Sequence, residues 1–296
     1  MKNRLSIALP CLLICFLTGC LEFERQTLSF RYDSATDTLY IFQDYQGIFG
    51  VEDPARLTEA EREQMRSVMQ QERTFFFGNW LSEYNRELLL EKQQTPKGEL
   101  DADPAYEASL RALLEAALAN IKVENAGFYL NRGNRLCGAQ RVTVKNASKV
   151  VAALNHTLRF VARQEGNKWE TTKRARRLLY AFADSDQNAL RLDGNRVEIR
   201  WPVTEDDYGK FKDQSPQGAA FRESGGEMTY TNGVIVLTLG KPDSKWGSLT
   251  LPFSDHPYSS NSLAEAKTYG IKDSFDAAGS AKAFLEGTSP TVGRRK

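Results

Sequence analysis

Histidine and cysteine are scarce in this chain. Its 296 residues include two histidines, His156 and His256, and four cysteines, of which Cys11, Cys15 and Cys20 lie within the first 20 positions. Because zinc sites are built mainly from imidazole and thiolate ligands, a zinc site is not expected. The sequence gives no reason to expect any other cofactor.

Recognisable enzyme motifs are absent as well. The chain contains no Gly-x-Ser-x-Gly, Gly-x-x-x-x-Gly-Lys-Ser/Thr, His-Glu-x-x-His or Gly-x-Gly-x-x-Gly sequence. Carboxylate-pair chemistry stays open, because 38 acidic residues offer pairs that only the fold can bring together. The sequence therefore favours a protein that is not an enzyme, with a hydrolase using acid/base carboxylates as the alternative.

No charge excess marks a nucleic-acid partner. The chain carries 39 basic and 38 acidic side chains. A nucleic-acid binding domain usually shows a strongly basic balance, so no nucleic-acid partner is expected. The chain also shows no internal period of the kind that marks repeat proteins.

The first 21 residues have the three parts of a bacterial export signal. Lys2 and Arg4 form a basic start, an apolar run extends from Leu5 to Leu17, and small residues precede Cys20. The uncharged stretch 5–21 has 17 residues, fewer than the roughly 20 that a transmembrane helix needs. A cleaved signal is therefore favoured over a permanent membrane span.

The residues Leu17-Thr18-Gly19-Cys20 resemble the lipobox of bacterial lipoproteins, and the resemblance covers only the first 20 residues. It implies that residues 1–19 are a signal peptide that is removed. It also implies that Cys20 becomes the N-terminus and carries a thioether-linked diacylglycerol and an amide-linked acyl chain such as palmitate. An ordinary secretory signal with a chance cysteine is the alternative.

A lipid on Cys20 implies a protein of the cell envelope that is held to a membrane by its N-terminus. Leu21 is not the aspartate that favours the inner membrane in lipoproteins of enteric bacteria, so the outer membrane is favoured in a Gram-negative source. Cys11 and Cys15 leave with the signal, so Cys137 is the only free thiol of the mature chain. An intramolecular disulfide is thereby excluded.

The first half of the mature chain predicts a hairpin followed by helices. Apolar residues alternate over 28–32 and again over 39–42, with a turn at 33–37 and about seven residues between Cys20 and the first strand. Thr58 and Glu61 form a capping-box pattern, which opens a helix expected to run to about Gln94, or two helices joined near Gly78. Asp103 and Pro104 open a further helix to about 121.

The second half predicts hairpins that alternate with helices. Strands are expected on both sides of 131–134, and helices at 147–163 and 172–184. Asp193-Gly194 and Asn232-Gly233 each predict a tight hairpin turn. A last strand around 249–251 is expected to extend the sheet of these hairpins. The pattern indicates an α+β fold in which antiparallel hairpins pack with amphipathic helices.

Composition divides the chain into three parts. Residues 20–253 are expected to form a globular α+β body, which is either one unit or two subdomains of about 20–121 and 122–253. Residues 254–296 are rich in Ser, Ala, Gly and Lys and predict a flexible tail with one marginal helix at 262–269.

Two groups of residues are candidate catalytic or metal sites, and the sequence favours neither. Cys137 and His156 could form a nucleophile pair, but the helical spacing places His156 on a polar face, and Cys137 reads as a small buried hydrophobe. Asp184, Asp186 and Asn188 match the first ligand positions of a calcium loop. The loop lacks the turn glycine and the closing glutamate, because Ala189 and Asn195 stand there.

Two further groups are candidate partner surfaces. The aromatic residues Phe75, Phe76, Phe77 and Trp80 are either core or an exposed docking patch, because three adjacent aromatics cover more of a helix than one core stripe does. The run 173–177, Lys-Arg-Ala-Arg-Arg, reads as a solvated helix face, with an anionic partner as the alternative.

Together these patterns predict a lipid-anchored envelope protein with a binding or scaffolding role, whose partners are the membrane and an envelope protein. A hydrolase that uses carboxylates is the first alternative. A carrier of lipid or of a small ligand, with an apolar cavity beneath the long helix, is the second alternative.

Overall fold

The computed structural model describes residues 21–50, 57–76, 82–241, 244–253 and 275–288. The expected signal peptide and Cys20 lie outside these ranges. The described elements are helices and antiparallel sheets, so the predicted α+β class is confirmed. Among the described residues, no helix is both long and apolar enough to span a membrane.

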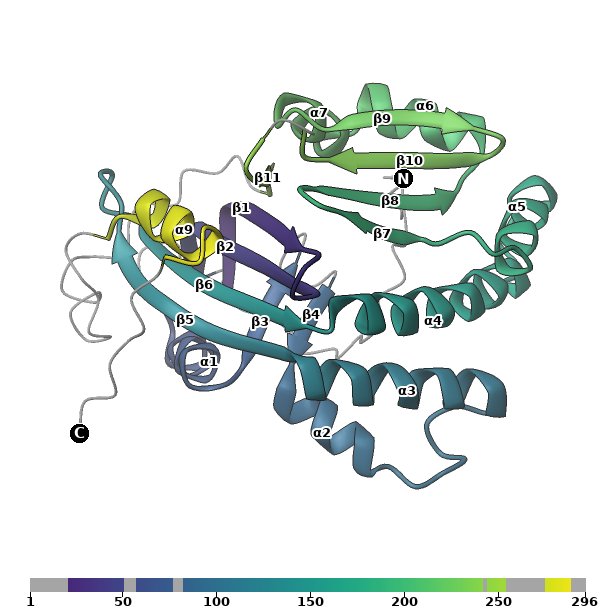
Figure 1. Ribbon diagram of the computed structural model, residues 1–296, viewed down its shortest axis with the longest axis horizontal. Helices are drawn as coiled ribbons and strands as arrows, with labels where there is room; N and C mark the ends of the chain where they lie inside the picture. Colours follow the sequence, from purple (N-terminus) through teal and green to yellow (C-terminus); the bar gives the residue numbers. More distant parts are fainter. Residues whose placement is uncertain (1–20, 51–56, 77–81, 242–243, 254–274, 289–296) are drawn as a thin grey trace.

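A five-stranded antiparallel sheet forms the centre of the fold (Figure 1). Its order is β11-β1-β2-β6-β5, built from β1 (Leu21–Asp33), β2 (Thr38–Gly50), β5 (Ile121–Leu130), β6 (Leu136–Lys145) and β11 (Gly247–Pro252). Strands from both sides of position 121 pair in this one sheet, so the chain does not divide into subdomains there.

The first hairpin is longer than its sequence pattern indicates. β1 and β2 pair from Asp33 and Thr38 back to Leu21 and Gly50. β1 therefore begins directly after Cys20, where about seven residues of linker were expected. The alternation was missed at the start of β1 because Glu22, Glu24 and Gln26 interrupt it with polar side chains.

The prediction over 58–94, one long helix or two helices joined near Gly78, is wrong for the middle of this segment. The structure has α1 (Glu59–Gln70), then a short hairpin of β3 (Arg73–Phe76) and β4 (Ser82–Asn85), then α2 (Arg86–Gln94). The capping box of Thr58 and Glu61 is present. The helix ends at residue 70 because Thr74 and the aromatic residues after it fit a strand better than a helix, and the main sheet supplies hydrogen bonds to this strand.

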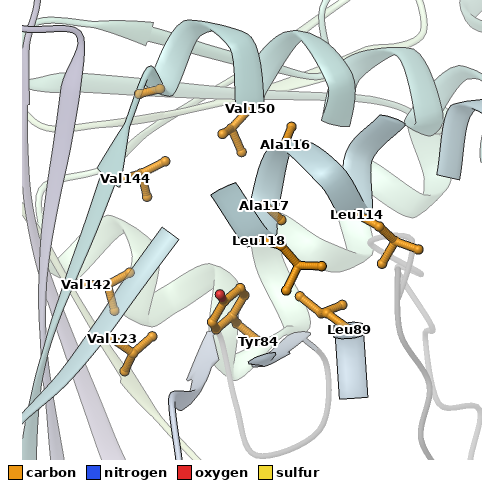
Figure 2. Packing of buried hydrophobic residues seen from close by; sticks show 11 residues of the cluster. Tyr84, Leu89, Leu114, Ala116, Ala117, Leu118, Val123, Val142, Val144 and Val150 are labelled. Atoms are coloured by element: carbon orange, nitrogen blue, oxygen red, sulfur yellow. The ribbon is translucent and has the colours of Figure 1, made fainter. Parts of the chain in front are cut away.

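Helices α3 (Pro104–Asn120), α4 (Ala147–Asn167) and α5 (Lys173–Ala183) lie where the sequence predicts them. The side chain of Asp103 accepts hydrogen bonds from the first turn of α3. α3 precedes β5 and α4 follows β6, so both helices extend from the same end of the sheet (Figure 1). Their apolar faces and the adjoining strands form one core cluster, which includes Leu114, Leu118, Val142 and Val150 (Figure 2).

The second sheet has four strands in the order β7-β8-β10-β9. β7 (Leu190–Asp193) and β8 (Arg196–Pro202) form one predicted hairpin, and β9 (Glu227–Thr231) and β10 (Val234–Leu239) form the other. Two helices between them, α6 (Glu205–Gln214) and α7 (Pro216–Glu223), were not anticipated, although Thr204 and Ser215 cap them. The sheet that β11 extends is also corrected, because β11 pairs with β1 in the five-stranded sheet.

Part of the expected flexible tail is folded. Residues 277–285 form α9 (Ala277–Leu285), which lies on the five-stranded sheet (Figure 1). Leu285 is fully buried, and the ring of Phe284 meets the edge of Tyr40 at 5.6 Å between centroids. Phe284 and Leu285 are the two large apolar side chains of an otherwise small-residue helix, and both are buried in this contact. The helix expected at 262–269 lies outside the described residues.

Candidate functional site

An apolar pocket of about 50 Å³ lies between α1 and the five-stranded sheet. Its apolar walls come from five elements and consist of Phe23, Ile48, Met65, Val68, Phe75 and Phe128. Tyr45, Gly138 and Gln140 line it from β2 and β6, and Glu22 and Gln64 complete the lining. The pocket therefore lies near the start of β1.

Close packing of aromatic rings against a glycine shapes the walls. The rings of Phe23 and Tyr45 meet edge to face at 5.1 Å, and Phe253 meets Phe23 at 5.4 Å. A Cβ atom on Gly138 would lie 2.8 Å from the ring of Phe128. Gly138 thus leaves the space on β6 that the ring of Phe128 occupies.

Buried amides and hydroxyls lie beneath these walls. Asn125, Gln140 and Gln43 are cross-strand neighbours on β5, β6 and β2, and both glutamines are almost completely buried. The Gln140 amide donates to Asn125 Oδ1 and to the Arg73 carbonyl, both at 2.8 Å. The Gln43 amide donates to the Thr74 hydroxyl at 2.7 Å. These side chains therefore pin β3 to the main sheet.

Tyr45 joins this polar layer to the pocket. Its hydroxyl lies 3.0 Å from Gln140 Oε1, 3.1 Å from Gln43 Oε1 and 2.9 Å from the Thr74 hydroxyl, and it accepts the Phe75 N–H at 3.1 Å. Burial raises the pKa of Tyr45 above its ordinary value, so the group stays a neutral phenol. We name Tyr45, Gln43, Gln140 and Thr74 the polar floor.

A buried ion pair between β3 and β4 lies next to the polar floor. Arg73 is 3% exposed, its Nε donates to Glu83 Oε1, and its guanidinium lies 5.2 Å from the centroid of Phe75. An unpaired charge at this depth would be costly, so the pair holds the hairpin in one arrangement.

The geometry favours binding of an apolar group over acid/base chemistry. The polar atoms of the floor bond to one another, so the space they leave is bounded almost wholly by carbon. Among the residues that line the pocket, Glu22 alone carries a carboxylate. Hydrolysis by the paired-carboxylate mechanism needs two carboxylates about 5 to 10 Å apart, and the pocket lining does not provide this pair.

A second polar cluster lies on the other face of the sheet. Asp44 is 8% exposed and accepts hydrogen bonds from the Tyr129 hydroxyl at 2.6 Å and from the Gln46 amide at 2.8 Å. Burial raises the pKa of the Asp44 carboxyl. Burial also raises the pKa of the neighbouring Cys137 thiol to about 11, so Cys137 is a protonated, weak nucleophile at neutral pH.

The structure does not bring Cys137 and His156 together as a nucleophile pair. Cys137 is fully buried in β6, where its thiol lies 3.5 Å from the Arg135 carbonyl. His156 is exposed on α4 and meets the edge of Phe160 at 5.3 Å. The buried state expected of Cys137 and the polar face expected of His156 both match the structure.

The calcium-loop interpretation gains no support. Asp184 ends α5 and pairs with Arg163, while Asp186 and Asn188 are exposed in the turn that follows. Within the described ranges, no three His, Cys, Asp or Glu side chains are placed to hold a metal ion.

The aromatic and basic candidates have separate outcomes. Phe75 lies in β3, is 9% exposed and forms a pocket wall, so it is not part of an exposed patch. Phe76 ends β3, and Phe77 and Trp80 lie outside the described residues. In the basic run, Arg176 donates to the Gly166 and Lys168 carbonyls at the end of α4, while Lys173, Arg174 and Arg177 are exposed.

The burial of the polar floor was not predicted from the sequence. Glutamine and threonine in alternating strands ordinarily indicate a solvated face, and no local pattern reveals that β3 covers Gln43 and Gln140. The exposure of Trp169 was not predicted either; this residue is 86% exposed in the loop between α4 and α5.

Comparisons of the chain with protein-family models, with curated proteins and with solved structures find no match.

Proposed function

We propose that this protein is a lipid-anchored envelope protein that acts by binding, and that the pocket beneath α1 receives an apolar group of its partner. The lipobox-like residues before Cys20 support the anchor. The carbon-walled pocket over a self-bonded polar floor is the observation that carries the binding role.

The position of the pocket links these two parts of the proposal. β1 begins at Leu21, and Glu22 and Phe23 already line the pocket. At about 3.3 Å per strand residue, Phe23 is about 10 Å from Cys20 along the chain. An acylated Cys20 would hold the pocket beside the bilayer surface, which is that of the outer membrane in a Gram-negative source.

The size of the pocket limits what it can receive. Its volume of about 50 Å³ is well below the roughly 150 Å³ of an engineered apolar cavity that admits benzene. It fits the end of a side chain or a short branched group, and not a whole lipid. A partner protein that inserts an aliphatic side chain therefore fits better than a carried lipid, which we keep as the second candidate because the walls are apolar.

The anchor is tested by fractionating cells that express wild type or Cys20→Ser. We expect the wild type in the membrane fraction and the variant in the soluble fraction, since two or three acyl chains anchor a protein stably. Membrane retention of Cys20→Ser would contradict the anchor without bearing on the pocket.

The binding role is tested by placing a photo-reactive side chain at Gln64, which lines the pocket, or at its exposed neighbour Glu63 on α1. We expect a discrete crosslinked product in intact cells from position 64. Substituting Val68→Phe to fill the pocket should abolish this product. Equal crosslinking from both positions, or crosslinking that survives Val68→Phe, would contradict binding in the pocket.

A further inference from the structure

Three arginines surround one glutamate on the four-stranded sheet. Arg196, Glu198 and Arg200 alternate along β8, and Arg191 is the cross-strand neighbour of Glu198 on β7. The residues between them point to the opposite face, where Trp201 packs on Phe182 of α5 at 5.5 Å. The arginines therefore share the face of the sheet that is turned away from α5.

These guanidinium groups outnumber the carboxylates beside them. Arg200 donates to Glu198 Oε2 at 2.8 Å, but Arg191 and Arg196 are 3.9 Å from the same carboxylate, which is too long for a hydrogen bond. Asp193 lies 3.8 Å from Arg191. Three cations thus face one central and one peripheral carboxylate, an excess of one positive charge.

The donors of the cluster are also incompletely used. The Nε atoms of Arg196 and Arg200 are buried and have no hydrogen-bond partner. The side chains are about one-third exposed for Arg196 and Arg200 and one-half exposed for Arg191, so a solute can reach their ends. The exposed ends of the three side chains therefore combine positive charge with access, while the two unpaired Nε groups lie beneath the surface.

We propose that Arg191, Arg196 and Arg200 form a binding site for a phosphate group. A phosphate carries about −1.5 to −2 charges at neutral pH as a monoester and one negative charge as the diester of a lipid headgroup, so either form can neutralise the excess positive charge. Its oxygens are acceptors for the fork of N–H donors that each arginine presents. The phosphate belongs either to a free ester or to a lipid headgroup. This site is independent of Cys20 and of the pocket.

Removing the charge of Glu198 should change the affinity for phosphate in the opposite direction from removing an arginine. Its carboxylate attracts the arginines when no ligand is bound and repels an incoming phosphate. Glu198→Gln should therefore strengthen phosphate binding, whereas loss of an arginine should weaken it. A cluster that serves only to stabilise the sheet predicts no such gain.

The first test is calorimetric titration of the Cys20→Ser chain with inorganic phosphate at low ionic strength. We expect measurable binding, at least tenfold weaker in Arg196→Gln/Arg200→Gln, at least threefold tighter in Glu198→Gln, and unchanged in Arg174→Gln, a control that removes an exposed arginine of α5. Arg196→Lys, which keeps the charge and loses the fork, should also weaken binding and guards against a folding defect. No binding by the wild type, equal loss in the control, or weaker binding by Glu198→Gln would each overturn the site.

The second test distinguishes the two sources of phosphate. Cys20→Ser protein is sedimented with vesicles of phosphatidylglycerol or of phosphatidylcholine. Co-sedimentation with phosphatidylglycerol that is lost in Arg196→Gln/Arg200→Gln assigns a lipid headgroup. Binding of inorganic phosphate without co-sedimentation assigns a free ester. Co-sedimentation that persists in the double variant, together with no binding of inorganic phosphate, overturns the site.

Discussion

The phenol oxygen of Tyr45 lies 3.0 Å from Oε1 of Gln140, so one hydrogen bond joins β2 to β6 directly beneath the pocket. The same hydroxyl reaches Thr74 on β3 at 2.9 Å. Tyr45 thus connects the main sheet to the β3–β4 hairpin, whose residue Phe75 forms a pocket wall. The polar floor and the apolar pocket are parts of one structural arrangement.

Tyr45→Phe should destabilise the fold. The substitution keeps the ring but removes the donor to the buried Gln140 Oε1, whereas Gln43 Oε1 still accepts from the Gln26 amide. A buried acceptor left unsatisfied typically costs about 1–3 kcal/mol. Denaturant unfolding should show a lower midpoint with an unchanged slope. Tyr180→Phe is the matched control, because the Tyr180 hydroxyl bonds Asn167 in an exposed position and should matter by about 0.5 kcal/mol or less. Equal effects of the two substitutions would contradict the role of the polar floor.

Gly138→Ala should distort the pocket. Because the new Cβ would meet the buried ring of Phe128 at 2.8 Å, the ring must move, and overpacking of this kind costs about 1–3 kcal/mol. Unfolding measurements should show the loss, and a crystal structure should show Phe128 displaced. Gly209→Ala on α6 has open space around it and should be neutral or stabilising. An unmoved Phe128 ring would contradict the close contact between Gly138 and Phe128.

Asp44 should make stability depend on pH. Because burial raises its pKa in the folded state, the folded protein retains a proton that the unfolded chain releases between the two pKa values. The free energy of unfolding must fall as pH rises through this window. The stability of wild type relative to Asp44→Asn should therefore be greater at pH 4 than at pH 7. A difference that does not change with pH, or that changes in the opposite direction, would refute the buried, protonatable carboxyl.

Leu285→Ala should be strongly destabilising even though it lies within a segment whose composition indicates a tail. Leu285 is fully buried on the five-stranded sheet, and such a truncation typically costs about 2–5 kcal/mol. Leu90→Ala, at a position that is 39% exposed, is the control and should cost far less. If thermal unfolding shows the two variants to be alike, α9 is not docked in solution.

Local chemistry made several elements predictable. The turns at Asp193-Gly194 and Asn232-Gly233 have positive φ at Gly194, Asn232 and Gly233, and these residue types adopt such angles readily. Asp103 caps α3 because its carboxylate can reach the free N–H groups of the first turn. Each of these signals depends on residues that are neighbours in the sequence.

The elements that sequence missed depend on distant partners. β3 forms because Gln43, Gln140 and Tyr45 hydrogen-bond to its residues. α9 packs on the sheet because the ring of Phe284 contacts the rings of Tyr40 and Phe42. The pairing of β11 with β1 joins residues more than 200 positions apart. The pocket forms only where β1, β2, α1, β3, β5 and β6 meet, so no local sequence motif predicts it.

Intact mass spectrometry of protein extracted from membranes of its native host tests whether a lipid-bearing N-terminus holds the pocket at a membrane. We predict a chain that begins at Cys20 and carries the added mass of a diacylglycerol and one further acyl chain. A Cys20 with an unmodified thiol, or a chain that retains residues 1–19, would contradict it.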